Sequence, residues 1–501
     1  MKIYLLAPLL LVLAQTRAQK AYKAADAFAK TITAADLKTH LTIIAGAEME
    51  GRETATPGQK KAAVYIENYF KTLGLQPGNG SSYQQYYPVY RDSFLAAEVS
   101  INGQALALNT DFTPALASPI GSLGFGEVVY VNFEDSAWKN GKVDVQGKLV
   151  LFRFQGLSGA GANAGFGNTV GVRINGLMAK GAAAALVVQD IFPLTKPFER
   201  LTNMRTNKLL NRQSMAYFNI SPAWAKGILG NDWEAATEGK LPSKVYKAEV
   251  QTTYNKQRLV LESSNVLALL PGTDKADEYL VITGHYDHIG RQGDVINFGA
   301  DDDGSGTVSV LELAEAFAKA KAAGKGPRRS IVFMTVSGEE KGLWGSEYYA
   351  NHPVYPLEKT TANLNIDMVG RLDSLHIKRG VSKYVYVVGD DKLSSDLTPI
   401  SVFANKKTKL ELDPKYNDPK DRERIYFRSD HYNFAKNGVP IIFYFNGVHP
   451  DYHRPTDTVD KIEFEVMSQR AQLVFYTAWD MVNRDAMLKR DIPLPASAMG
   501  R

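Results

Sequence analysis

Residues 279–313 read YLVITGHYDHIGRQGDVINFGADDDGSGTVSVLEL, and this stretch decides the fold class. Its first five residues are apolar or β-branched and predict a buried strand. From residue 307 to 323, apolar side chains recur at helical spacing and predict an amphipathic helix. A strand, a polar loop and a helix in this order form the repeating unit of an α/β protein.

Segments on both sides of this stretch repeat the alternation. Short apolar runs predict further strands at 266–270, 331–336, 362–367, 384–388 and 440–445. Helical spacing predicts helices after Glu339, at 466–482 and, near the N-terminus, within 36–75. Strands that alternate with helices predict a mostly parallel central sheet flanked by helices.

Residues 109–250 differ in character from the rest of the chain. Short β-rich runs at 126–132, 148–154 and 183–188 alternate with glycine-rich loops and one helix at about 172–180. We therefore expect a smaller, β-rich α/β domain inserted into the larger one. The expected division is a signal peptide at 1–18, the N-terminal part of the larger domain at 19–108, the insert at 109–250, the main part at 251–490 and a tail at 491–501.

The first residues predict export. Lys2 precedes an almost wholly apolar run from Ile3 to Ala14, and a short exit ends in the small residue Ala18. This order is typical of a secretory signal peptide, and the run is too short to cross a hydrocarbon core of about 30 Å. No later segment has eighteen uninterrupted apolar residues, so we expect a periplasmic or secreted protein without stable membrane insertion.

The amino-acid composition excludes several other classes of protein and of site. The 501 residues include 58 Lys and Arg against 53 Asp and Glu, a net charge of +5, and no cysteine. So small a surplus of positive charge does not indicate a nucleic-acid partner. The absence of cysteine excludes a disulfide framework, a thiolate zinc site and a cysteine nucleophile.

Polar residues follow four of the predicted strands at the point where each ends. In an open α/β sheet, the carboxyl ends of the strands are where ligands bind. A shared metal site explains why imidazole and carboxylate side chains gather there, together with the acidic loop at 301–303. The strand-end residues are His285, Glu339, Glu340, Asp367 and His453.

The segment from 285 to 288 has an internal pattern. Residues two apart share one face of an extended chain, so His285 and Asp287 point one way and His288 the other. A carboxylate beside an imidazole is the usual support of a metal-bound histidine. Of the other histidines, we expect His431 to be packed in the interior and His449 to lie on a surface loop.

A calcium loop is the alternative for the acidic segment. An EF-hand needs an entering helix, whereas residues 290–298 form a glycine-containing loop, and Glu312 falls within a predicted helix. The context therefore disfavours calcium. The residues that match the EF-hand pattern are Asp301, Asp303, Ser305, Gly306, Val308 and Glu312.

Five motifs in order resemble one known family. They are GHYD at 284–287, GADDDGSG at 299–306, SGEEKGLWGS at 337–346, NIDMVG at 365–370 and DYHRPTDT at 451–458. Together they resemble the co-catalytic di-zinc exopeptidases of metallopeptidase family 28, which contains bacterial secreted aminopeptidases and glutamate carboxypeptidase II. The resemblance covers residues 36 to 480 and implies the aminopeptidase-like fold. The insert is similar to a protease-associated domain, which some members carry at this point.

The resemblance implies a role for each motif residue. It implies two Zn²⁺ per chain and a water that they activate for attack on a peptide bond. His285 and Asp367 would hold one ion, Glu340 and His453 the other, and Asp302 would bridge both. Glu339 would be the general acid/base, Asp287 would orient His285, and Tyr452 would help to stabilise the oxyanion.

The expected activity is therefore that of an exported zinc exopeptidase acting on peptides, above all an aminopeptidase that removes N-terminal residues. A carboxypeptidase or dipeptidase would use the same metal site, with Arg291, Arg371 or Arg428 as candidate anchors for a substrate carboxylate. A non-catalytic receptor or binding module of the same fold is the remaining alternative. The sequence leaves side-chain preference and oligomeric state open.

Overall fold

The computed structural model describes residues 24–154, 170–194, 198, 200–208 and 214–494. The described residues form two compact units, one comprising those up to Pro88 and from Glu262 onward, the other Val89–Leu261. The expected signal peptide at 1–18 and the end of the expected tail lie outside the described residues.

The sheet of the first unit has the strand order β16-β15-β17-β14-β10-β13-β9. Its four neighbours β17, β14, β10 and β13 run parallel, whereas β15 and β9 each pair antiparallel with the strand next to them. The carboxyl ends of four adjacent strands therefore meet at one edge. The bounds are β9 (Lys244–Leu270), β10 (Lys275–His285), β13 (Arg329–Val336), β14 (Thr360–Ile366), β15 (Tyr384–Val388), β16 (Glu411–Asp413) and β17 (Ile441–Phe445).

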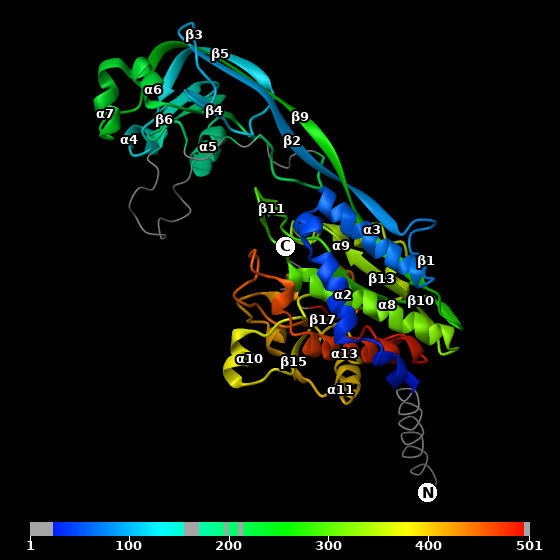
Figure 1. The fold of residues 1–501 in the computed structure, drawn as a ribbon. Coiled ribbons are helices and arrows are strands. Elements are labelled where there is room, and N and C mark those ends of the chain that lie inside the picture. The colour runs from blue at the N-terminus through cyan, green and yellow to red at the C-terminus, as the bar shows by residue number, and fades with distance from the viewer. Residues whose placement is uncertain (1–23, 155–169, 195–197, 199, 209–213, 495–501) are drawn as a thin grey trace. The chain divides into compact units, whose positions relative to one another are not determined.

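Helices cover both faces of this sheet because its strands are apolar on both sides. On β10, Leu280 and Ile282 join one core cluster, and Val281 between them joins another. The first cluster also takes residues from α2 (Ala34–Ile44), α3 (Pro57–Thr72), α8 (Gly306–Ala322), α11 (Leu397–Asn405) and α13 (Phe464–Asn483) (Figure 1). The second includes residues of α9 (Trp344–Asn351) and α12 (His431–Ala435). The predicted α/β class with a mostly parallel, helix-flanked sheet is confirmed.

Several helices begin or end at different residues from those predicted. The helical stretch near the N-terminus is two helices, α2 and α3, joined by the short helix η1 (Ala47–Arg52). Pro57 occupies the first turn of α3, where its missing N–H leaves no bond unmade. The helix expected after Glu339 begins five residues later, at Trp344.

The second unit contains the order β9-β5-β6-β7-β8-β4. It spans Val89–Leu261, wider than the expected 109–250, since the long strands β2 (Gln84–Ile101) and β9 run beyond the predicted limits. Its likeness to a protease-associated domain stays a prediction. Its other elements are β3 (Gln104–Ala105), β4 (Phe112–Pro114), β5 (Gly121–Tyr130), α4 (Ser136–Lys139), β6 (Leu149–Phe154), α5 (Val170–Ala179), β7 (Ala184–Gln189), β8 (Ala216–Ile220), α6 (Pro222–Leu229) and α7 (Trp233–Thr237).

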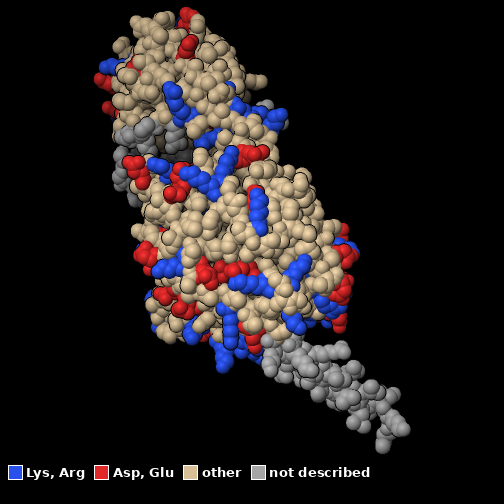
Figure 2. All heavy atoms as spheres, turned by 45° about the vertical axis from the view of Figure 1, so that its right-hand side comes forward, with Lys and Arg blue, Asp and Glu red and all other residues tan. Residues whose placement is uncertain are grey.

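The first unit also contains the short strands β1 (Gln76–Pro77), β11 (Arg291–Gln292) and β12 (Val295–Ile296) and the short helix α10 (Ser374–Arg379). Within the described ranges, no helix is both long and apolar enough to cross a membrane. Figure 2 shows basic and acidic side chains interspersed over the face that it draws.

Candidate metal and catalytic site

The parallel strands bring the predicted site residues to one edge of the sheet. His285 is the last residue of β10, and Asp367 directly follows β14. Glu339 and Glu340 lie in the turn after β13, and His453 lies in the loop after β17. The side chains therefore reach the site from the carboxyl ends of four different strands, with the two glutamates sharing the end of β13.

Asp302 lies between two histidines. Its Oδ1 is 3.3 Å from His285 Nε2, and its Oδ2 is 3.0 Å from His453 Nε2. On the His285 side, Asp367 Oδ1 is 3.7 Å from the same ring nitrogen. On the other side, Glu340 Oε2 is 3.1 Å from His453 Nε2. One carboxylate thus presents an oxygen to each of two nitrogen–carboxylate pairs, which is the geometry of a bridging ligand.

The neighbouring acids of the loop are engaged elsewhere. Asp303 Oδ2 accepts the backbone N–H of His285 at 3.0 Å, and its Oδ1 accepts the backbone N–H groups of Gly306 and Met368 at 2.8 and 3.0 Å. Asp301 Oδ1 accepts the N–H of Gly370 at 2.6 Å. Asp303 and Asp301 therefore hold the loop against two strand ends, and Asp302 faces both histidines.

The donors at this site fit a metal ion. His285 Nε2, Asp302 Oδ2 and Glu340 Oε1 are buried and have no hydrogen-bond partner among the described residues. Leaving a buried polar atom unsatisfied costs about 1–3 kcal/mol, and more for a charged group. Cations coordinated by these atoms remove that cost, and imidazole with carboxylate oxygen suits a zinc ion.

The electrostatics separate the two adjacent glutamates. Burial, with the carboxylates of Glu340 and Asp367 nearby, raises the pKa of Glu339 well above its usual range. Glu340 is also buried, but the imidazoles of His288 and His453 close to its carboxylate hold its pKa below the usual value. Glu339 is therefore suited to carry a proton, and Glu340 is suited to remain a charged ligand.

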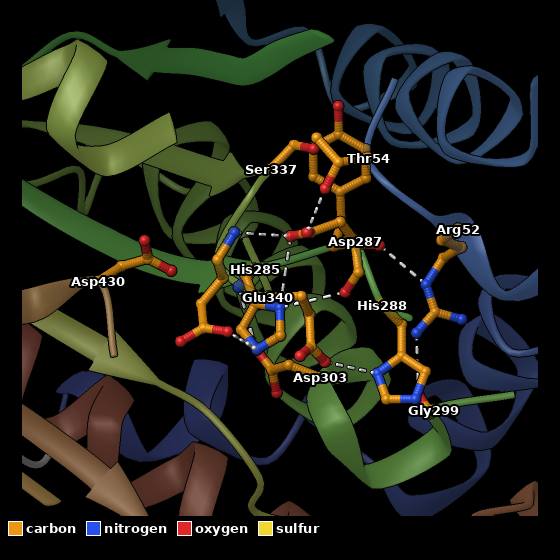
Figure 3. Close-up of polar contacts among 12 residues, drawn as sticks. Arg52, Thr54, His285, Asp287, His288, Gly299, Asp303, Ser337, Glu340 and Asp430 are labelled. Carbon is orange, nitrogen blue, oxygen red and sulfur yellow. Dashed lines mark hydrogen bonds and ion pairs between the residues drawn. The ribbon is translucent and has the colours of Figure 1, made fainter. Parts of the chain in front are cut away.

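Asp287 supports both halves of the site. Its carboxylate accepts a hydrogen bond from Thr54 Oγ1 at 2.7 Å and one from the backbone N–H of Glu339 at 3.2 Å. Its Oδ1 lies 3.6 Å from His285 Nδ1, and that nitrogen is also 3.1 Å from the Asp287 carbonyl oxygen (Figure 3). Asp287 therefore fixes the histidine ring and the backbone of Glu339 together.

Two buried groups brace the loop that carries Asp302. Asp457 Oδ2 accepts the backbone N–H groups of both Asp301 and Asp302, at 3.0 and 3.1 Å. Arg52 is fully buried, and its guanidinium donates to the carbonyls of Tyr286 and Gly299 at 2.8 and 2.9 Å (Figure 3). Both ends of the loop are thereby tied to distant parts of the chain.

His288 is a residue that the alternation argument missed. Its Nδ1 lies 2.9 Å from Glu340 Oε1 (Figure 3). Its ring centroid is 5.8 Å from that of His453. The predicted opposite face is wrong because β10 ends at His285, so the chain is no longer extended at residue 288. Gly299 makes room for this ring, since a Cβ there would lie 2.5 Å from His288 Cγ.

The calcium-loop alternative is wrong. Glu312 lies within α8, where its Oε1 is 3.4 Å from His40 Nε2, so it does not close a calcium loop. His449, expected on the surface, is instead buried, with Nε2 3.2 Å from Asp301 Oδ2. His431 is buried as expected and stacks on Phe443 with ring centroids 4.6 Å apart.

A small cavity of about 30 Å³ opens beside these groups. Tyr452 lies in its wall, and its hydroxyl accepts a hydrogen bond from Arg428 Nη2 at 3.3 Å. Of the three candidate arginines, Arg428 lines this cavity, whereas Arg371 pairs with Asp451 at 2.9 Å. Its lining residues are Asp302, Glu339, Asp367, Met368, Ile425, Arg428, Phe443, Phe445, Val448 and Tyr452.

An open α/β sheet with buried imidazole and carboxylate donors at its carboxyl edge is the arrangement expected of a metal-binding α/β protein. Residues 265–478 match the model of peptidase family M28. The resemblance predicted from the five motifs is thereby confirmed.

Two curated relatives carry names that agree with this family. A probable leucine aminopeptidase of Arthroderma otae is 28% identical over 263 residues, which cover 51% of this chain and 67% of that protein. A probable zinc metalloprotease of Leptosphaeria maculans is 32% identical over 184 residues, which cover 34% of this chain and 39% of that protein. The chain thus spans 39% of the length of one relative and 67% of the other.

A solved structure extends the likeness in fold to most of the chain. The aminopeptidase from Aneurinibacillus sp. strain AM-1 superposes with a TM-score of 0.52 at 21% identity. The superposition covers 93% of this chain and 98% of that one. The fold is therefore shared well beyond the region matched by the family model.

Proposed function

We propose that this protein is an exported zinc-dependent exopeptidase, and specifically an aminopeptidase that removes N-terminal residues from peptides. The observation that carries the proposal is the position of Asp302 between His285 and His453, at 3.3 and 3.0 Å, on the wall of the cavity. This arrangement supports two zinc ions, one held by His285 and Asp367 and the other by Glu340 and His453. When bound, zinc supplies polarisation of a peptide carbonyl and a lower pKa for water.

Glu339 handles the proton in this proposal. Its Oε2 is 3.9 Å from His285 Nε2, and the side chain lines the cavity. Burial raises its pKa well above the usual range, so the carboxyl group can hold a proton taken from water and release it to the leaving amine. Its backbone N–H is held by Asp287, which fixes where the side chain starts.

Tyr452 and Arg428 also line the cavity. The Tyr452 ring stacks on that of His453, with centroids 3.9 Å apart, and Arg428 donates to its hydroxyl. A hydroxyl held by a cation is a good hydrogen-bond donor to an oxygen that gains negative charge. We assign Tyr452 to oxyanion stabilisation and Arg428 to positioning its hydroxyl.

The rest of the cavity wall favours an apolar substrate side chain. Phe443 and Phe445 come from β17, and Met368, Ile425 and Val448 extend the apolar surface. A pocket of this kind gains about 25 cal/mol for each Å² of apolar surface that a substrate buries. We therefore propose that peptides with a large apolar N-terminal residue are the better substrates.

Arg428 favours a second candidate function. A guanidinium in the cavity wall can bind a substrate carboxylate in a two-pronged manner. The same metal site would then serve a dipeptidase or a carboxypeptidase, with Arg428 as the anchor. A non-catalytic binding module is disfavoured, because all five ligand positions and Glu339 carry side chains suited to the reaction.

Export and the nature of the insert complete the proposal. The apolar run from Ile3 to Ala14 supports a signal peptide and a periplasmic or secreted location. The alternating strands and helix of the second unit support a protease-associated domain. Recovery of a secreted chain that begins near residue 19 tests the first point.

Turnover of matched substrates tests the activity. Purified protein is given leucyl-, phenylalanyl- and glutamyl-anilides, and one leucine-initiated peptide in free, N-acetylated and C-amidated forms. The aminopeptidase proposal requires that acetylation abolish cleavage, that amidation have little effect, and that a chelator stop all turnover. Loss of cleavage on amidation alone would instead support the carboxypeptidase candidate. Turnover that persists in chelator and in Glu339→Gln would refute the proposed mechanism.

A further inference from the structure

A cluster of one histidine and two acids lies at the far edge of the first unit's sheet. His376 belongs to the short helix α10, and Glu411 and Asp413 stand two residues apart on the edge strand β16. His376 Nε2 is 3.4 Å from Asp413 Oδ2 and 3.8 Å from Glu411 Oε1. None of these three residues belongs to the candidate metal and catalytic site.

The histidine ring is held firmly in place. It stacks on the Tyr384 ring with a centroid distance of 3.4 Å and an interplanar angle of 1°. Its Nδ1 is 2.9 Å from Asp373 Oδ1, and the same carboxylate accepts a hydrogen bond from Tyr386 at 2.6 Å. A carboxylate at Nδ1 fixes the tautomer and leaves Nε2 with a free lone pair, as in metal-bound histidines.

The nitrogen that faces the acids lacks a hydrogen bond. His376 is fully buried, and its Nε2 has no hydrogen-bond partner among the described residues. A buried nitrogen in this condition destabilises the folded chain unless something binds it. A cation between Nε2 and the two carboxylates would satisfy all three groups at once.

We propose that His376, Glu411 and Asp413 bind one zinc ion separate from the catalytic site. Ligand atoms about 2.0–2.2 Å from a tetrahedral zinc lie about 3.3–3.6 Å apart. The observed spacings of 3.4 and 3.8 Å are close to this, and close to the 3.3 and 3.7 Å spacings around His285 Nε2. Imidazole with two carboxylates suits zinc better than calcium or magnesium, which prefer all-oxygen sites.

Arg379 competes with the ion in this arrangement. Its Nη2 lies 2.7 Å from Glu411 Oε1, the same oxygen that faces His376. The Arg379 side chain is 44% exposed, so it can move away into solvent when a divalent cation enters. The bound ion would tie α10 to β16 and thereby stabilise the sheet edge.

Zinc content of the full-length protein tests the site. The variant Glu411→Gln/Asp413→Asn removes two partly exposed carboxylates and leaves the buried histidine untouched. Stripped protein is dialysed against zinc, and bound metal is measured per chain. The double variant should bind one zinc fewer than the parent while peptide hydrolysis stays within about twofold. Glu423→Gln, which removes an exposed acid paired with Lys415, is the matched control and should keep the parental zinc content.

Two further measurements distinguish a metal site from the alternative in which His376 simply forms ion pairs with the two carboxylates. Arg379→Gln should tighten zinc binding at this site, because it removes the competing cation. Added zinc should raise the melting temperature of the parent by more than that of the double variant. Equal zinc content in the parent and the double variant after dialysis would overturn the proposal, whether or not the catalytic site binds metal.

Discussion

Asp287→Asn tests whether the two halves of the catalytic site share one support. The substitution keeps the volume of the side chain and removes its charge. The Asp287 carboxylate now accepts two hydrogen bonds, at 2.7 Å from Thr54 and at 3.2 Å from the Glu339 backbone. An asparagine side chain offers one oxygen and one NH₂ group, so one of these two donors loses its acceptor.

The magnitude follows from these contacts. A hydrogen bond to a charged group contributes about 1.5–3 kcal/mol, and every 1.4 kcal/mol is a factor of about ten. Loss of one such bond therefore predicts a fall in kcat/KM of about 10–100-fold, the scale also found when the outer partner of a metal-bound histidine is removed. The bond from His285 Nδ1 to the Asp287 carbonyl survives, so the ring should keep its orientation.

Steady-state hydrolysis of a leucyl anilide measures kcat/KM, and zinc titration of the stripped protein measures zinc affinity. Thr54→Val is the matched control, because it removes one hydrogen bond to the same carboxylate and leaves the charge in place. Its effect should be smaller than that of Asp287→Asn. Parental kcat/KM and parental zinc affinity in Asp287→Asn would refute the idea that this carboxylate organises the site.

Four further outcomes are expected. Glu339→Gln should cut kcat by about 10²–10⁴-fold at unchanged metal content. Glu340→Gln should chiefly weaken zinc binding, and its activity should recover in added zinc. If a metal assay shows the reverse pattern, the two glutamates have each other's role. Asp302→Asn should lower the zinc occupancy of both proposed ion positions. Elemental analysis should then show a loss of more than one zinc per chain. Burial lowers the pKa of His431 to about 3, so the unfolded chain binds the extra proton between pH 6.5 and 3. The free energy of unfolding should therefore fall by up to about 1.4 kcal/mol per pH unit below 6.5, and denaturant titrations of His431→Leu should lack this contribution. Intact-mass measurement of secreted protein should give a chain beginning near Gln19, and retention of residues 1–18 would contradict the signal peptide.

The sequence was a good guide to the strands of the first unit and to the residues at their ends. Buried parallel strands read as short apolar runs, and residues such as His285 and Asp367 follow those runs directly. Because the carboxyl ends of parallel strands meet at one edge, four separate stretches of sequence could be assigned to one place before any coordinates were known.

Alternation gave a wrong answer where the strand geometry no longer applied. His288 lies three residues beyond the end of β10, and its position beside Glu340 depends on the turn, on Gly299 and on Arg52. The burial of His449 against Asp301 likewise depends on a loop that crosses from another part of the chain. Such long-range contacts leave no local periodicity in the sequence.

The limits of the insert were also hard to predict. Strand β9 runs through 27 residues, but only its last part, Val266–Leu270, is a continuous apolar run. Its first half alternates between buried and exposed residues, as expected for a strand with one solvated face. The expected end of the insert at residue 250 falls within this strand, whereas the compact unit extends to Leu261.

The bonds from Asp457 to the amides of Asp301 and Asp302 span 156 and 155 residues of chain. During synthesis, the acidic loop leaves the ribosome long before the segment that braces it. A nascent chain that stops before residue 457 therefore lacks the brace, and one that stops before 453 also lacks the last histidine. Under the proposed function, unfinished copies of this protein cannot cleave the N-termini of other new chains, and peptidase activity begins only with the nearly complete polypeptide.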